Sequence, residues 1–216
     1  MTNSLLLQLT DGLIIRSEET LISGVNIKLE AGSVSLLTGP NGSGKSTLLT
    51  ALAGEKFLAS GSLMFGKTQR SQISLTEMAK KRSLMLQQDE AIDQLRAKDV
   101  LELADIGSTI PEYAKEFISK ISSAELRNNT LGSLSIGQRT RVFLAAIATQ
   151  NSEVMLLDEP TAGLDPEAIS LLSSFLVSHT EAGGAVLLAT HEDSLRAIAK
   201  QEYSISEKEL ILKSIS

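Results

Sequence analysis

The sequence predicts an α/β fold built on a parallel sheet that helices cover on both faces. Residues 34–37, 154–157 and 186–189 are short apolar runs, and stretches with helical spacing separate them. Parallel strands buried on both faces show such continuous apolar runs. A glycine-rich loop follows the first run and two acids follow the second run, so polar chemistry is expected where these strands end.

The composition indicates a globular chain without extensive disorder. Its 216 residues, 42% of them hydrophobic and 21% charged, suffice for one large domain or for one domain with a small lobe. The net charge of −6 gives no general attraction for nucleic acid, and no nucleic-acid partner is expected. The absence of cysteine excludes disulfides and thiolate metal sites.

No membrane-crossing or targeting segment is expected. Residues 1–4 do not begin a basic segment followed by an apolar run and a cleavage site, which a signal peptide needs. The longest apolar run, 142–148, is far shorter than the roughly 20 residues that span a bilayer. We therefore expect a chain that can lie against a membrane but cannot cross one.

The remaining elements follow in chain order. Residues 25–29 alternate apolar and polar side chains, as a half-buried strand does. From about 89 to 133 no strongly apolar strand occurs, which predicts a small helical lobe inserted between core segments 1–88 and 134–216. The end of the chain, 203–212, is typical of a hairpin.

A phosphate-binding loop is the first functional motif. It follows a predicted strand, precedes a predicted helix and consists of Gly39, Pro40, Asn41, Gly42, Ser43, Gly44, Lys45, Ser46 and Thr47. Its glycines allow backbone N–H groups to surround phosphate oxygens, and the helix dipole favours an anion. Lys45 is expected to reach the β- and γ-phosphates, and the Ser46 hydroxyl to ligate Mg²⁺. A mere glycine-rich turn capped by Ser46 is the alternative.

Two acids at the end of the strand 154–157 are the second motif. In α/β proteins, ligands bind at the carboxyl ends of the strands. Asp158 suits direct or indirect coordination of Mg²⁺, and Glu159 suits polarisation of the attacking water. Solvated carboxylates at a strand end are the alternative, which the phosphate loop in the same chain disfavours.

A third motif leads to a family. Residues 134–138 read LSIGQ, lie before the acidic strand and resemble the signature LSGGQ of the ABC (ATP-binding cassette) ATPases. Residues 160–165 resemble that family's D-loop, His191 its switch histidine and Gln88 its Q-loop glutamine, with Gln87 as an adjacent alternative. The ordered motifs cover nearly the whole chain, which thus resembles the ATP-binding subunit of an ABC transporter.

The resemblance implies a fold and an assembly. The fold is the P-loop ABC cassette: a mixed sheet core with an antiparallel β subdomain and a small helical subdomain. Ser135, Gly137 and Gln138 would contact the γ-phosphate bound by another subunit, in a head-to-tail dimer with itself or a homologous cassette. Asp165 would lie at the dimer seam, and it also suits the N-cap of a helix that begins with Pro166.

The resemblance also implies roles within one subunit. His191 would hold the γ-phosphate and water geometry, and Gln88 would sense Mg²⁺ and couple the lobe to a membrane partner. His179 matches no motif and is expected to be an ordinary core or surface residue. The implied ligands are ATP and Mg²⁺.

Two positions depart from the family pattern. Ile136 replaces a signature glycine. Residues 13–19 contain no aromatic side chain that could stack on adenine, and Arg16, whose guanidinium plane can stack on a base, is the nearest match.

The function expected from these features is ATP hydrolysis that powers transport through a separate transmembrane permease. The chain would then be cytoplasmic and bound to the inner face of the membrane through the permease, with the transported substrate selected by other chains. The alternative is a soluble ABC ATPase of a non-transport system such as cofactor assembly. A P-loop kinase or GTPase switch is disfavoured by the signature and by the pair of Asp158 and Glu159.

Overall fold

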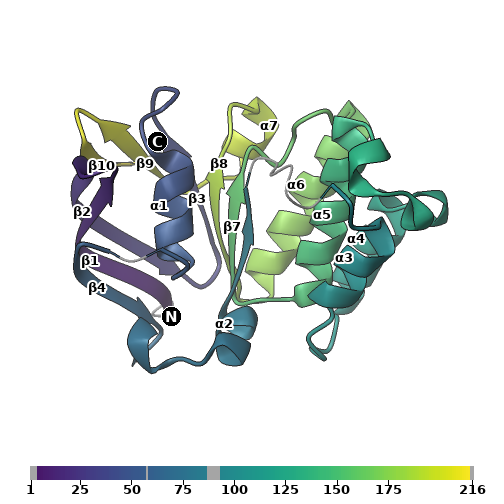
Figure 1. Ribbon diagram of the computed structural model, residues 1–216, viewed down its shortest axis with the longest axis horizontal. Coiled ribbons are helices and arrows are strands. Elements are labelled where there is room, and N and C mark those ends of the chain that lie inside the picture. The colour runs from purple at the N-terminus through teal and green to yellow at the C-terminus, as the bar shows by residue number, and fades with distance from the viewer. Residues whose placement is uncertain (1–3, 57, 87–92, 215–216) are drawn as a thin grey trace.

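A mixed sheet forms the centre of the protein, whose computed structural model describes residues 4–56, 58–86 and 93–214 (Figure 1). The strands are β1 (Leu5–Arg16), β2 (Glu19–Glu30), β3 (Ser33–Thr38), β4 (Ser60–Phe65), β5 (Thr68–Gln69), β6 (Arg82–Met85), β7 (Val154–Asp158), β8 (Ala185–Ala189), β9 (Gln201–Ser206) and β10 (Glu209–Ser214). The helices are α1 (Lys45–Leu52), α2 (Leu75–Lys81), α3 (Ala97–Ala104), α4 (Glu112–Ile121), α5 (Ile136–Gln150), α6 (Pro166–Glu181) and α7 (Asp193–Arg196). Within these described residues the strand order is β5-β4-β1-β2-β10-β9-β3-β8-β7-β6.

The parallel half of the sheet contains β9, β3, β8, β7 and β6. Every residue of β7 and β8 is buried, because successive side chains enter two different cores. Leu156 and Leu187 pack into the core that contains α1, whereas Leu157 and Leu188 pack into the core that contains α5 and α6. Figure 1 shows these helices on opposite faces of the sheet, which confirms the predicted α/β fold.

The antiparallel half is built from β1, β2 and β4. In β2 the buried Val25 and Ile27 alternate with the exposed Asn26 and Lys28, as the period of two predicts. A hairpin of β9 and β10 lies beside this half, and β10 meets β2 at the pair Glu209 and Ser23. The β1–β2 hairpin thereby extends the sheet beyond the strands that carry the phosphate loop.

Helices α3 and α4 lie in the segment where the sequence predicts a helical lobe, and both pack against α5. Phe117 of α4 stacks on Phe175 of α6 with ring centroids 4.3 Å apart. Tyr113 Oη lies 3.3 Å from Nδ1 of the buried His179. Burial lowers the pKa of His179 to about 4, so this imidazole is neutral at physiological pH and joins the helical part to the core.

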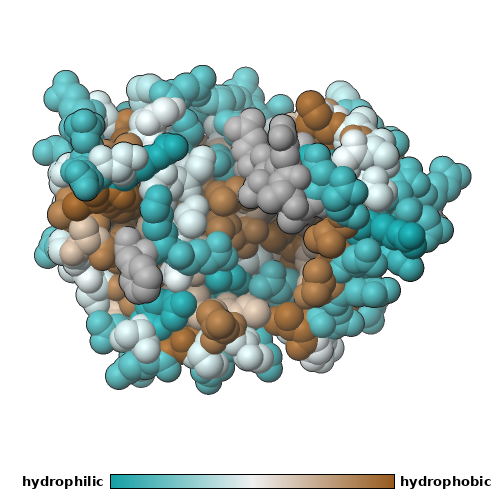
Figure 2. Space-filling view, viewed as in Figure 1, coloured by the Kyte–Doolittle hydropathy of each residue, from teal (hydrophilic) through white to brown (hydrophobic). Residues whose placement is uncertain are grey.

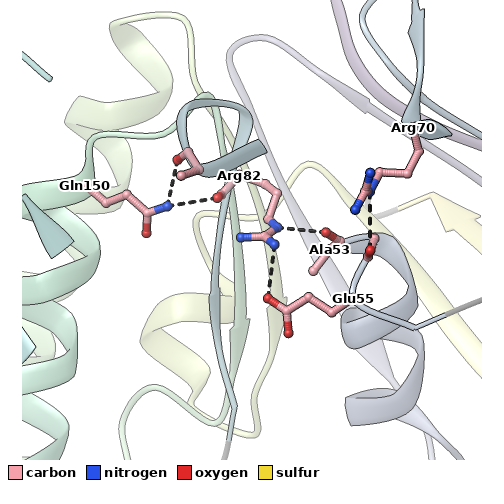
Figure 3. A network of polar contacts seen from close by, with 7 residues as sticks. Ala53, Glu55, Arg70, Arg82 and Gln150 are labelled. Atoms are coloured by element: carbon pink, nitrogen blue, oxygen red, sulfur yellow. Dashed lines mark hydrogen bonds and ion pairs between the residues drawn. The ribbon is translucent and has the colours of Figure 1, made fainter. Parts of the chain in front are cut away.

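A polar network fastens the far end of α1 to the neighbouring elements (Figure 3). Arg82 Nε donates to the carbonyl of Ala53 at 2.7 Å, and its Nη2 lies 3.0 Å from Glu55 Oε1. Gln150 Nε2, at the end of α5, donates to the carbonyl of Arg82 at 3.1 Å. The helix that starts at the phosphate loop therefore ends against β6, which is in turn hydrogen-bonded to α5.

The distribution of apolar residues bears on how the chain contacts membranes and other proteins. In the described residues no helix has the length and apolar character needed to cross a bilayer. Figure 2 shows a mostly hydrophilic face on which apolar side chains gather between the sheet and the helices α3 and α4.

Candidate active site

The phosphate loop connects β3 to α1 through a tight turn. Gly39, Gly42 and Gly44 have φ values of 150°, 79° and 103°, which favour glycine. A Cβ atom at Gly39 would lie 2.9 Å from the carbonyl oxygen of Ile205. The loop is therefore packed against β9. Backbone conformation favours glycine at all three positions, and close neighbours leave little room for a side chain at Gly39 and Gly44.

Two side chains of this loop fit a bound triphosphate. Lys45 Nζ donates to the carbonyls of Gly39 and Pro40 at 2.9 and 3.2 Å, so the ammonium group lies over the turn. Ser43 Oγ is buried and has no hydrogen-bond partner among the described residues. Since an unpaired buried hydroxyl is costly, a phosphate oxygen in the loop would supply a missing partner.

A serine and an aspartate form the candidate Mg²⁺ position. Ser46 Oγ, in the first turn of α1, donates to Asp158 Oδ2 at 2.5 Å. Asp158 ends β7 and is only 3% exposed. Hydroxyl and carboxylate oxygens next to a phosphate loop are the ligands that Mg²⁺ prefers, so the donor set fits this ion.

Glu159 and His191 meet where two neighbouring strands end. Asp158 pairs with Ala189 across β7 and β8, and the Glu159 N–H donates to the Ala189 carbonyl at 2.7 Å. His191 Nε2 lies 3.5 Å from Glu159 Oε1. Glu159 has a φ of 47°, a left-handed conformation that costs roughly 1–3 kcal/mol outside glycine and often occurs at functional sites.

The signature motif begins α5. Ser135 is its N-cap, and its Oγ accepts from the Gln138 N–H at 3.3 Å while the Gln138 side chain accepts from the Ser135 N–H at 3.0 Å. A Cβ at Gly137 would lie 2.0 Å from the carbonyl oxygen of Gly163. The glycine is thus required within the chain by contact with the D-loop. The sequence motif by itself predicts only the phosphate contact of Gly137.

Further contacts attach the D-loop to the signature helix. Thr140 Oγ1 donates to the Ala162 carbonyl at 2.8 Å, and Arg141 lies 2.6 Å from Asp165 Oδ2. Asp165 caps α6, and the hydrogen bond from the Ala168 N–H, helped by Arg141, lowers the pKa of Asp165. Thr140 and Arg141 directly follow the signature in the sequence, but their partners lie more than twenty positions away, where spacing gives no signal.

The predicted residues form two groups in the structure. One unites the phosphate loop with the carboxyl ends of β7 and β8; its members are Lys45, Ser46, Asp158, Glu159 and His191. The other unites the signature with the D-loop. Among the described residues, no hydrogen bond joins residues 135–138 to the phosphate loop.

Two predicted residues remain apart from both groups. Gln88, with its alternative Gln87, lies outside the described residues. Arg16 is exposed at the end of β1 and pairs in register with Glu19 of β2. Its hairpin contacts the phosphate loop through Leu21, which lies against Gly44.

This fold and site define a P-loop nucleotide hydrolase, and comparisons with known proteins specify the family. Residues 22–162 match the family model described as ABC transporter. The chain is 31% identical to ABC transporter I family member 1 of Arabidopsis thaliana, over 82% of this chain and 78% of that protein. It is 32% identical to the hemin import ATP-binding protein HmuV of Streptomyces coelicolor, over 82% of this chain and 65% of that protein.

A solved structure supports the same fold. The dimeric MJ0796, a bacterial ABC transporter cassette, superposes with a TM-score of 0.81 at 22% identity and covers 97% of this chain and 99% of its own. The chain therefore belongs to the ABC transporter family, as the resemblance predicted. It is the ATP-binding and ATP-hydrolysing subunit of such a transporter.

Proposed function

We propose that the chain hydrolyses ATP with Mg²⁺ at sites shared between two cassettes and thereby powers transport through a separate permease. The observation that carries this proposal is the meeting of Glu159 and His191 beside the Ser46–Asp158 pair at the end of the phosphate loop. These groups supply, in one place, a base, an orienting imidazole and ligands for a metal ion.

Each group in the site has a distinct task in this proposal. Lys45 and the loop N–H groups bind the phosphates, and the Ser43 hydroxyl donates a hydrogen bond to a phosphate oxygen. Ser46 and Asp158 would hold Mg²⁺, which neutralises charge on the phosphate oxygens when bound. Glu159 orients the attacking water and accepts its proton, and His191 holds the Glu159 carboxylate in place.

A second cassette completes the site. The signature has no hydrogen bond to its own phosphate loop among the described residues, and MJ0796, whose fold is similar, is described as dimeric. Ser135 and Gln138 at the N-terminus of α5 would then face the γ-phosphate held by the partner, where the helix dipole favours an anion. Arg141 holds Asp165 at the same seam, and Gly163 of the D-loop packs against Gly137 of the signature.

The base of the nucleotide would rest on the β1–β2 hairpin. Leu21 of this hairpin touches Gly44, so the hairpin borders the phosphate loop. Arg16 is exposed on it and offers a guanidinium plane for stacking. Stacking on Arg16 would tolerate guanine as well as adenine.

The permease would bind between the sheet and the helical part, at the inner face of the cell membrane. Apolar side chains gather there in Figure 2. Of the elements on either side, β6 is followed by Leu86, which is 37% exposed, and α3 carries Leu103, which is 72% exposed. Gln88, two residues after Leu86, would connect this contact to Mg²⁺. No membrane-spanning helix occurs in the described residues, which fits a subunit held by its partner.

Substitution of the base tests the proposal. Glu159→Gln keeps the shape of the side chain but cannot accept a proton, so turnover should fall about 10²- to 10⁴-fold while ATP binding persists. Light scattering should then show an ATP-dependent dimer that ADP does not support. Glu181→Gln, an exposed change at the end of α6, is the control and should behave as wild type. Turnover of Glu159→Gln within a few-fold of wild type would remove Glu159 from this role.

A further inference from the structure

One carboxylate of β9 connects two elements of the site. Glu202 Oε1 accepts from Thr38 Oγ1 at 2.7 Å, and Glu202 Oε2 lies 3.6 Å from Arg196 Nη2. The Glu202 side chain is 16% exposed and that of Arg196 38%. Each oxygen of Glu202 therefore faces a different partner, one on β3 and one on α7.

The β3 partner leads directly to the phosphate loop. Thr38 is the last residue of β3 and precedes Gly39. Glu202 lies level with Leu36 in the parallel pairing of β9 and β3, so its side chain reaches forward to Thr38. The Ile205 carbonyl of the same strand packs against Gly39. Strand β9 thus supports the start of the phosphate loop at two points.

The α7 partner leads to the switch histidine. Arg196 ends the short helix α7, which begins two residues after His191. Leu195 is fully buried, and the Glu192 N–H donates to Thr190 Oγ1 at 3.1 Å, so the segment around His191 is anchored on both sides. The Glu202–Arg196 contact links this segment to β9.

We infer that Glu202 is a positioning residue that sets His191 at the correct distance from the phosphate loop. This inference rests on the proposed function of His191. Glu202 touches neither nucleotide nor water; it acts through Thr38 on one side and Arg196 on the other.

Energetics distinguish this role from ordinary stabilisation. A partly exposed ion pair with a 3.6 Å separation contributes little to stability, because solvent screens it and side-chain entropy opposes it. The rate of a reaction depends far more steeply on the placement of catalytic groups. Loss of the contact is therefore expected to alter turnover more than the melting temperature.

Glu202→Gln is the direct test, because the amide oxygen can still accept from Thr38 while the charge facing Arg196 is lost. We expect kcat for ATP to fall about tenfold, with the Kd of a fluorescent ATP analogue within about twofold of wild type. Arg196→Gln should reproduce this loss and Arg196→Lys should restore part of it. In a His191→Ala background, Glu202→Gln should have no further effect, since the pathway through His191 is already broken.

The control is Glu153→Gln, which removes the 2.7 Å ion pair with Lys81 next to the opposite end of β7 and should leave kcat unchanged. The inference is overturned if Glu202→Gln also leaves kcat unchanged, or if it lowers kcat equally with and without His191. Either result with an active wild type leaves the proposed function standing. A wild-type chain that neither binds nor hydrolyses ATP would overturn the proposed function as well.

Discussion

Replacement of Gly137 by alanine should disrupt the signature from within its own chain. The added Cβ would lie 2.0 Å from the Gly163 carbonyl oxygen, so one backbone must move by roughly 1.5 Å to reach van der Waals distance. Overpacking of this kind costs about 1–3 kcal/mol, which lowers the melting temperature of a chain of this size by about 2–12 °C. Displacement of the D-loop should also lower kcat by up to about 10²-fold.

Calorimetry and steady-state ATP hydrolysis measure the two effects separately. Ile136→Ala is the matched control, because it shortens the neighbouring side chain, which is 61% exposed, without adding an atom near Gly163. The reasoning is refuted if Gly137→Ala has the melting temperature of wild type and loses activity only because it dimerises more weakly. The contact with Gly163 would then not be the reason for the glycine.

Three further predictions concern the dimer, the base and a buried histidine. Lys45→Ala and Ser135→Arg should each be inactive alone, yet a mixture should recover hydrolysis because one site of the mixed dimer carries neither change; no recovery, with mixed dimers present, would contradict the shared site. In competition binding, the preference for ATP over GTP should be below about tenfold, or about 1.4 kcal/mol, since stacking on Arg16 does not distinguish adenine from guanine. A preference of several hundredfold would mean that another residue recognises the base. The depressed pKa of His179 means that the unfolded chain binds the extra proton, so urea unfolding should show about 2 kcal/mol less stability at pH 5 than at pH 7, a loss that His179→Gln should largely remove.

The sequence predicts those parts of the protein whose signals are local. The apolar runs of β3, β7 and β8 carry the sheet, and the glycine spacing from Gly39 to Gly44 specifies a turn that the positive φ values bear out. The N-cap at Asp165 with Pro166 after it is likewise a local signal, and α6 starts there. Each of these features depends on residues within a few positions of one another.

Contacts between segments that are distant in the sequence leave no local pattern from which they could be predicted. Gly137 reads as a signature residue, but its contact with Gly163 depends on how α5 packs against the D-loop. Glu202 lies outside every motif, and its partner Thr38 is 164 positions away. The 12-residue strand β1 is also not predicted from the sequence. Its pairing with β2 shifts register several times, so apolar and polar side chains do not alternate regularly along it.

The fastening of α1 at its far end limits where motion can occur. The phosphate loop holds the first turn of this helix, while Arg82 holds the Ala53 carbonyl just past its last turn. Because α1 is held at both ends, it can move only together with the phosphate loop and β6. A displacement of the phosphate loop would therefore be passed to β6, whose Arg82 carbonyl accepts from Gln150 of α5, while α3 and α4 contact α5 through side-chain packing.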